Sequence, residues 1–299
     1  MKDLAPALPA DPADQPANPS RRRIFQAASA VGLAASLPAL ADAAPARKTI
    51  AKGSLDAKLK AHVKNVVVIY LENRSFNNLF ANFPGTSAPL SAVTAEQAQQ
   101  LDRDGKPLAT LPKIWGGLVP NQQNIGGIDY LIKEEQISGL PNAPYKLSDA
   151  AGKPLPESII TRDLVHRFYN NQMQINGGKN DGFAAWADSG GLVMGHYGET
   201  SKNLNLWQIA EQYTLCDNFF MAAFGGSYMN HQFLVTGRAN EYFNAPDTAA
   251  KKKIAVLSDG PQGVRLAISP DCPASALDGK PKYVNDGAIT PDGYAVNTM

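Results

Sequence analysis

The sequence predicts an α/β fold. The main evidence is two apolar runs, each of which is followed by a segment expected to be helical. Residues 64–71 are continuously apolar and rich in β-branched side chains, and Glu72 and Asn73 follow near the end of the run. Residues 213–220 are interpreted as a second strand, after which comes a glycine turn. The first run does not alternate between apolar and polar residues. Both faces of its strand are therefore expected to be buried, as in a parallel sheet covered by helices.

The composition fits a globular protein with no nucleic-acid partner. The 299 residues suit one large domain or two ordinary ones, and 44% are apolar, which is enough for a sizeable core. The formal net charge is +1, so nothing favours nucleic acid or an anionic membrane surface. Cys216 and Cys272 lack the spacing of a zinc site. A disulfide in an oxidising compartment and two buried free thiols both fit the sequence.

Residues 1–43 are interpreted as a twin-arginine export peptide. The stretch 20-SRRRIF-25 precedes an alanine-rich apolar region, and Ala41-Asp42-Ala43 resembles a cleavage site. An N-terminal membrane anchor is the alternative, but the region is short for a spanning helix. We therefore expect a mature protein starting near Ala44, in the periplasm or outside the cell, with the Tat export machinery as a partner. Residues 44–61 are expected to be a linker and 62–299 the folded domain, with no further membrane span.

Helical periodicity predicts three helices, over residues 75–83, 161–175 and 201–212, and a fourth that follows Ser227. Ser75 is placed to cap the first of these helices. The apolar side chains expected to line these helices are Phe76, Leu79, Phe80, Phe83, Leu164, Phe168, Met173, Leu204, Trp207, Ile209, Met229, Phe233 and Leu234.

The remaining segments show little periodicity. Residues 84–160 are rich in proline, glycine, alanine and serine, and we expect a long excursion over the surface. Residues 254–256 are one short strand candidate. The order strand, helix, excursion, helices, strand, turn, helix favours an α/β fold, in which ligands bind beyond the carboxyl ends of strands.

Glu72 and Asn73 are candidate metal ligands at such a strand end. A carboxylate and an amide carbonyl supply two of the oxygen ligands that hard cations take. The alternative is that Glu72 pairs with Arg74 and that Asn73 caps the following helix.

Ser227 is a candidate nucleophile in the stretch F-G-G-S-Y-M-N-H-Q. Gly226 and the glycine before it allow a tight turn, and the amides at a helix N-terminus favour an anion such as phosphate. The stretch is not the G-x-S-x-G turn of esterases. Asn230 and His231 follow at helical spacing and could share the face of Ser227. The alternative is that Ser227 only caps the helix.

Three other positions carry weaker signals. His166 could point into a site or into a core, and His196 lies in a loop-like stretch. Asp181, in 176-NGGKNDGF-183, could ligate a cation, although turns use such residues anyway.

Three blocks together resemble the bacterial phosphoesterase family of secreted acid phosphatases and phospholipases C. They are 66-VVVIYLENRSFNNLF-80, 172-QMQINGGKNDGF-183 and 213-YTLCDNFFMAAFGGSYMNHQFLV-235, in the family's order and rough spacing. The resemblance covers roughly residues 62 to 299, and the E-N-R-S-F stretch is its most specific part.

The resemblance implies the fold of the alkaline-phosphatase superfamily, a large, mostly parallel sheet flanked by helices. It also implies that Glu72 and Asn73 ligate a divalent metal ion and that Ser227 forms a phosphoenzyme. His166 and His231 would lie near the phosphate, with Asn230 and Gly226 supporting the pocket.

The resemblance further implies an acid phosphatase that hydrolyses phosphate monoesters. Phospholipases C of the family usually carry threonine at the position of Ser227, within a different motif, so the serine favours the phosphatase. A phospholipase C acting on phosphatidylcholine-type lipids is the alternative. Family members carry more metal ligands, typically an acidic pair, in a C-terminal portion. The residues that end this chain are loop-like. We therefore expect the N-terminal part of a phosphoesterase domain, and a non-catalytic fragment is the remaining alternative.

Overall fold

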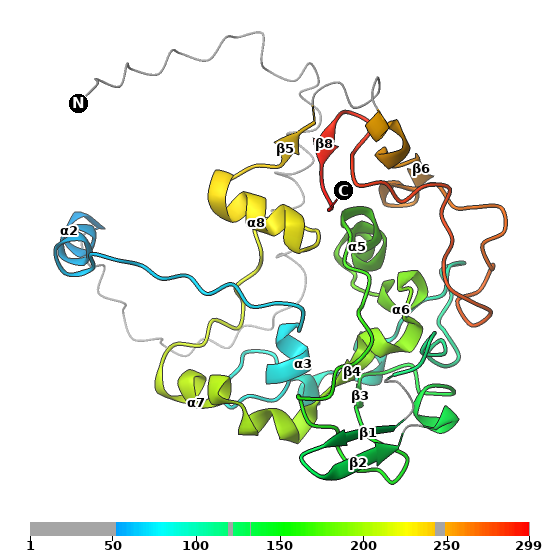
Figure 1. Cartoon of the computed structure of the whole chain (residues 1–299), viewed down its shortest axis with the longest axis horizontal. Coiled ribbons are helices and arrows are strands. Elements are labelled where there is room, and N and C mark those ends of the chain that lie inside the picture. Colours follow the sequence, from blue (N-terminus) through cyan, green and yellow to red (C-terminus); the bar gives the residue numbers. More distant parts are fainter. Residues whose placement is uncertain (1–51, 119–121, 132, 243–248, 299) are drawn as a thin grey trace, which may run out of the picture. The chain divides into compact units, whose positions relative to one another are not determined.

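A computed structural model describes residues 52–118, 122–131, 133–242 and 249–298 of the chain (Figure 1). The chain divides into two units, which meet between Ile69 and Tyr70. The expected export peptide, residues 1–43, lies outside the described residues. Within the described part, no helix combines the length and the apolar character that crossing a membrane requires.

The described part of the first unit consists of one helix and an irregular segment. Helix α2, Lys52–His62, takes up all of the described residues that the sequence suggested as a linker. Residues 63–69 follow without regular secondary structure. Their apolar side chains are exposed, and those of Val66, Val67 and Ile69 are each more than three-quarters exposed.

The second unit mixes short helices with small sheets, which gives it α/β character. Its described α-helices are α3 (Phe76–Phe80), α4 (Ala95–Ala98), α5 (Phe168–Ile175), α6 (Phe183–Trp186), α7 (Asn205–Gln212) and α8 (Ser227–Thr236). Its described 3-10 segments are η2 (Leu90–Ala92), η3 (Glu134–Gln136), η4 (Asn176–Gly178), η5 (Gly190–Met194), η6 (Gly198–Asn203) and η8 (Ala249–Lys253).

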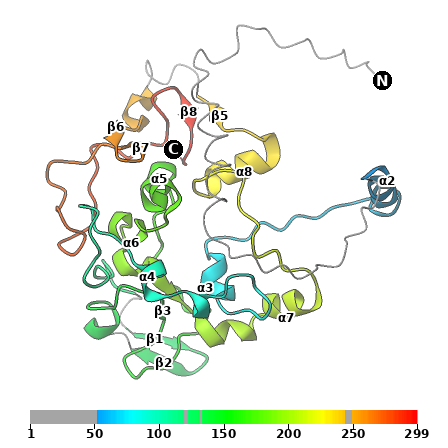
Figure 2. The same cartoon turned by 180° about the vertical axis from the view of Figure 1, so that it is seen from behind.

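The described strands form four two-stranded sheets. The antiparallel pairs are β1 (Gln122–Ile125) with β2 (Ile128–Leu131), β5 (Asn240–Glu241) with β8 (Tyr294–Ala295), and β6 (Leu257–Gly260) with β7 (Gly263–Leu266). The parallel pair is β3 (Tyr145–Lys146) with β4 (Gly195–His196). Figure 2 shows the β6–β7 hairpin beside α5, and β7 contacts this helix.

The strands expected over residues 64–71 and 213–220 are not formed, so these two predictions are wrong. Both segments lack regular secondary structure, and Phe219 and Phe220 are about four-fifths exposed. A strand requires neighbours to satisfy its amide and carbonyl groups. No described segment pairs with either run. The candidate at residues 254–256 reduces to an isolated bridge between Ile254 and Ile289.

The largest buried cluster comes from the segment that the sequence suggested as a surface excursion. The members of this cluster are Ile114, Leu118, Tyr130, Leu147, Leu155, Ile159, Leu192 and Tyr197. Six of these eight lie between residues 84 and 160. The expectation of a surface excursion is therefore wrong, because isolated apolar side chains from irregular segments make up this core.

Helix α3 packs against α7 through aromatic rings, and this contact fixes the start of the unit. The rings of Phe80 and Trp207 are stacked with centroids 5.9 Å apart, and Phe83 contacts both. The Trp207 indole N–H donates to the carbonyl of Leu79 at 2.9 Å. The predicted cap is confirmed, since Ser75 Oγ accepts from the backbone N–H of Asn78.

Helix α5 begins later than the periodicity predicts. Residues 161–167 are not helical, because their backbone is bonded elsewhere. The N–H of Val165 donates to Asp188 Oδ1 at 3.1 Å, and the N–H of Arg162 donates to the carbonyl of Leu118. Two side chains expected to face inward, Ile209 and Leu234, are each 54% exposed.

Candidate functional site

A buried asparagine holds the turn that precedes Ser227. The Asn230 side chain is 4% exposed, and its Nδ2 donates to the carbonyls of Ala223, Gly225 and Gly226 at 3.1–3.2 Å. Its Oδ1 accepts from the N–H of Ala223 at 3.2 Å. Both halves of the amide are therefore used, which fixes the backbone that leads into α8.

Ser227 is the first residue of α8 and lies half-buried at the helix N-terminus. Gly226 occupies the cap position, and no side chain caps this end of the helix. The interpretation of Ser227 as a cap is therefore wrong. No described group hydrogen-bonds its hydroxyl, and the first amides of α8 lack partners within the helix. The N-terminus of a helix attracts anions.

His166 packs directly against this turn. A Cβ atom added at Gly226 would lie 2.0 Å from the carbonyl oxygen of His166 and 3.2 Å from its Cδ2. Gly226 therefore allows a close approach that no other residue allows. The structure brings together His166 and the turn before Ser227, which are far apart in the sequence.

Both histidines of the site use Nδ1 to bind a backbone carbonyl. His166 Nδ1 lies 2.6 Å from the oxygen of Leu164, and His231 Nδ1 lies 2.8 Å from the oxygen of Ser227. A carbonyl only accepts, so Nδ1 carries the proton in each ring. This leaves Nε2 of each ring available for proton transfer. In His166, Nε2 is bonded to Cδ2, the atom that faces Gly226.

Tyr70 connects the Glu72 segment to α8. Its ring and that of His231 have centroids 4.3 Å apart at 55°, and its hydroxyl lies 3.6 Å from the sulfur of Met221. Burial raises the pKa of Tyr70, and the charge of Glu72 adds to this increase. The segment that carries Glu72 and Asn73 is therefore joined to the helix that carries Ser227.

Glu72 and Asn73 are exposed, and the alternative roles considered for them are wrong. Arg74 does not pair with Glu72; it donates to the carbonyls of Glu157 and Ile159 and lies 4.4 Å from the Tyr197 ring centroid. Ser75, and not Asn73, caps α3.

The donor set at Glu72 and Asn73 suits part of a hard-cation site. No described group forms a hydrogen bond or ion pair with the carboxylate of Glu72 or the side-chain carbonyl of Asn73. Both groups carry oxygen atoms that can bind a metal ion. Among the described residues, no group of three or more histidine, cysteine, aspartate or glutamate side chains is placed to hold a metal ion. The two side chains would therefore form part of a cation site, which the described residues do not complete.

Asp181 and His196 lie away from this arrangement. Asp181 Oδ1 accepts from Asn176 Nδ2 at 2.6 Å, so its carboxylate holds the turn at the end of α5. His196 is buried in the β3–β4 pair, and burial together with the charge of Lys146 lowers its pKa. Cys216 and Cys272 are free thiols, so the disulfide alternative is not realised; Cys216 is exposed, contrary to the buried-thiol alternative.

Sequence patterns did not reveal two participants in this site. Nothing in the spacing links Tyr70 to His231, and Met221 lies in the segment expected to be a strand. Only the position of Tyr70, two residues before Glu72, offered a signal.

Comparison with known families identifies the family of the chain. No solved structure matches the chain. The model of the phosphoesterase family matches residues 63–299, which include Glu72, His166 and Ser227. Because the match covers well over half of the chain, the protein belongs to the phosphoesterase family, whose members hydrolyse phosphate esters.

Proposed function

We propose that the protein is an acid phosphatase, which hydrolyses phosphate monoesters through a phosphoserine formed on Ser227. The packing of His166 against Gly226 is the main support, because it brings an imidazole beside the backbone turn that leads into Ser227, whose hydroxyl no described group binds. The free amides of α8 would bind phosphoryl oxygens at the same point.

In the proposed first step, Ser227 Oγ attacks phosphorus and its proton passes to solvent. The Oγ–P bond forms while the bond from phosphorus to the leaving alcohol oxygen breaks. A protonated Nε2 of His166 or His231 gives its proton to that oxygen, which suits an acidic optimum. In the second step, water attacks phosphorus, the P–Oγ bond breaks and the serine regains a proton.

Glu72 and Asn73 are the residues that would hold a divalent cation in this proposal. When bound, such an ion would stabilise charge on the phosphoryl oxygens and favour the ionised serine. The Tyr70 contact with His231 would keep this part of the chain near α8.

Two further parts of the proposal concern architecture and location. We propose a fold of the alkaline-phosphatase superfamily, because the phosphoesterase family model matches residues 63–299. We also propose export by the twin-arginine route, which rests on the consecutive arginines and the cleavage pattern in residues 1–43.

The test is release of p-nitrophenol from p-nitrophenyl phosphate at mildly acidic pH, by the chain from Ala44 onward. Ser227→Ala is expected to lower turnover about a thousandfold or more. Ser91→Ala, at an exposed serine in η2, is the matched control and should leave turnover unchanged. Unchanged turnover by Ser227→Ala would sink the phosphoserine mechanism.

The same assay, with a chelator added or with phosphatidylcholine as a competing substrate, separates the phosphatase from the alternative functions. Loss of turnover with a chelator supports the cation, and preference for phosphatidylcholine over the monoester would identify a phospholipase C. No release by a folded sample would favour a non-catalytic phosphate-binding protein.

A further inference from the structure

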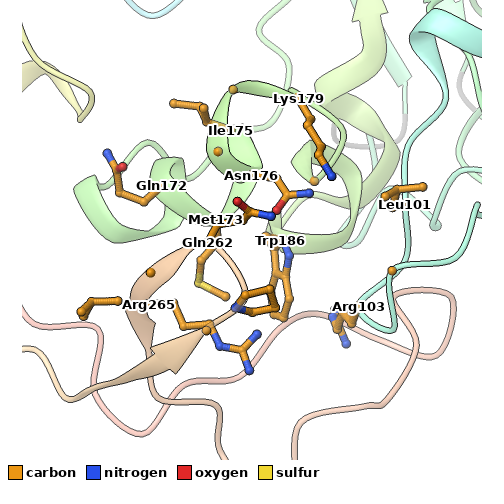
Figure 3. Close-up of a pocket in the computed structure, with 18 of the residues that line it drawn as sticks. Leu101, Arg103, Gln172, Met173, Ile175, Asn176, Lys179, Trp186, Gln262 and Arg265 are labelled. Carbon is orange, nitrogen blue, oxygen red and sulfur yellow. The ribbon is translucent and has the colours of Figure 1, made fainter. Parts of the chain in front are cut away.

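A cavity separate from the candidate active site lies between three segments of the second unit. Its volume is about 560 Å³, within the range of small-molecule sites. Its walls are the loop 101–105, the end of α5 with the following turn, and the tip of the β6–β7 hairpin (Figure 3). Phe224 adds to the lining, whereas Glu72, His166 and Ser227 do not line it.

The cavity lining is fixed by contacts between the walls. A Cβ atom at Gly177 would lie 2.6 Å from Gln262 Oε1, so the turn after α5 touches the hairpin tip. Asp181 holds the same turn through Asn176. The loop 101–105 is closed by hydrogen bonds between the backbones of Asp102 and Lys106 and of Gly105 and Asp102. The space is therefore formed by the fold and does not depend on one mobile side chain.

Three cations line the cavity, and no described carboxylate forms an ion pair with any of them. Figure 3 shows the side chains of Lys179, Arg265 and Arg103 around Trp186, each from a different wall. Lys179 and Arg265 have no hydrogen bond or ion pair from their side chains to a described residue. Nε of Arg265 is buried without a hydrogen-bond partner in the described part.

Arg103 is bonded only to uncharged groups. Its guanidinium donates to the carbonyls of Ala185, Pro273, Ser275 and Gly279 at 2.6–3.2 Å and contacts the sulfur of Cys272. Carbonyl oxygens satisfy its N–H groups but do not neutralise its charge, and arginine stays protonated in proteins.

The two carboxylates of the lining are already engaged. Asp102 accepts from the backbone N–H of Arg103 and Ala276 and from the hydroxyl of Ser275. Asp104 forms an ion pair with Lys106 at 2.8 Å. Neither carboxylate forms an ion pair with Lys179 or Arg265. The lining therefore carries an excess of positive charge.

Much of the rest of the lining is apolar or aromatic. Its apolar members are Leu101, Met173, Ile175, Trp186, Phe224, Pro261 and Val264. The guanidinium carbon of Arg103 lies 5.7 Å from the centroid of the Trp186 ring. A flat ring suits such a surface, since aromatic groups pack on one another in stacked or edge-to-face arrangements.

We propose that this cavity binds a small organic anion: one acidic group on a flat apolar body. The acidic group would accept a hydrogen bond from Arg265 or from Lys179, and the apolar body would lie against Trp186.

The test uses benzenesulfonate, which no phosphatase hydrolyses, in isothermal titration calorimetry at low ionic strength. We expect saturable one-to-one binding. At least one of Arg265→Gln and Lys179→Gln should weaken it about tenfold, as for a lost hydrogen bond to a charged group. Benzenesulfonamide, the uncharged analogue, should also bind at least about tenfold more weakly.

Lys113→Gln is the matched control, because it removes one positive charge from an exposed ion pair with Glu134, outside the cavity. It should leave binding unchanged. Equal weakening by all three variants would show long-range attraction alone and overturn the proposal. The absence of saturable binding to folded protein, or equal affinity for the sulfonamide, would also overturn it.

A Ser227→Ala variant should bind benzenesulfonate as tightly as the wild type, since Ser227 does not line the cavity. Loss of binding in that variant would place the anion at the candidate active site and overturn the proposal. The cavity and the phosphatase mechanism are thus tested separately.

Discussion

Gly226 is the residue on which the geometry of the candidate site depends most directly. Its Cα lies so close to the carbonyl of His166 that a side chain has no room. The neighbouring Gly225 differs, because the nearest atom to an added Cβ there is the sulfur of Met229 at 3.2 Å. The two adjacent glycines therefore differ, because only Gly226 is required by a contact between two backbone segments.

Gly226→Ala is expected to lower turnover of p-nitrophenyl phosphate about a hundredfold, since displacement of a catalytic group by about 1 Å costs that much. Gly225→Ala should retain most of the turnover, because a methionine side chain can move aside. Steady-state kinetics on both folded variants checks this difference. Equal losses in the two variants would contradict the role given to the His166 contact.

His196 should make stability dependent on pH. Burial lowers the pKa of His196, and the charge of Lys146 lowers it further. Below the ordinary histidine pKa of about 6.5, the unfolded chain therefore binds a proton that the folded protein does not bind. The unfolding free energy should therefore fall as the pH drops below that value, and level off below the lowered pKa. Urea denaturation between neutral and mildly acidic pH checks this slope.

His196→Gln should flatten the slope, because glutamine does not titrate. His62→Gln, at an exposed position in α2, is the control and should keep the slope of the wild type. Identical slopes for wild type and His196→Gln would show that other groups dominate the acid sensitivity.

At the scale of elements, the sequence predicts features that depend on neighbouring residues better than features that depend on residues far apart in the chain. The helix over residues 75–83 and its cap at Ser75 follow from spacing within a few residues, and α3 with its cap is present, although it ends at Phe80. The strands at 64–71 and 213–220 required partners that spacing cannot identify. An apolar run is compatible with a strand, but pairing decides whether the strand forms.

The same limit applies to the core and to the site. Ile114, Leu155 and Ile159 are fully buried although they lie in irregular segments, where no periodicity marks them. For the site, the family resemblance implied that Ser227 and His166 lie near one phosphate, and the structure places His166 against Gly226, the residue before Ser227. The contact of Tyr70 with His231 depends on how segments far apart in the chain fold, so no local pattern predicts it.

Helix α3 should depend on its cap. Ser75→Ala is expected to lower the unfolding free energy by about 1 kcal/mol, because the N–H of Asn78 loses its acceptor. Ser75→Asp restores an acceptor and places a negative charge at the helix N-terminus, so it should recover most of the loss. Urea denaturation followed by circular dichroism measures the three proteins. Equal stability of Ser75→Ala and wild type would mean that the aromatic contacts alone hold α3.

At the scale of the whole molecule, large apolar side chains on the surface stand out. Two segments around the candidate site, residues 70–73 and 213–235, carry large apolar side chains that are more than half exposed. They are Leu71, Tyr213, Phe219, Phe220, Met221, Phe224, Leu234 and Val235. Soluble monomers seldom expose many such side chains close together in sequence, and those that do tend to associate. The protein should therefore associate with itself as its concentration rises.

The double substitution Phe219→Ser with Phe220→Ser should reduce this association without lowering the unfolding free energy, since these rings bury little surface. Light scattering at increasing protein concentration, together with urea denaturation, measures both properties. Phe80→Ala is the contrasting control, because Phe80 is 7% exposed in the aromatic cluster and its loss should cost about 3–5 kcal/mol. Unchanged scattering in the double variant would locate the association elsewhere.

The irregular segment between α2 and Tyr70 also has a consequence for the lifetime of the protein. The segment exposes the side chains of Val66, Val67, Val68 and Ile69, and its backbone lacks the hydrogen bonds of a helix or a strand pair. Proteases cut exposed, irregular chain far more readily than packed helices and sheets. Limited digestion should therefore cleave here first and release the second unit from everything that precedes it. In a compartment that contains proteases, the half-life of the intact chain would depend on how long this one segment stays uncut.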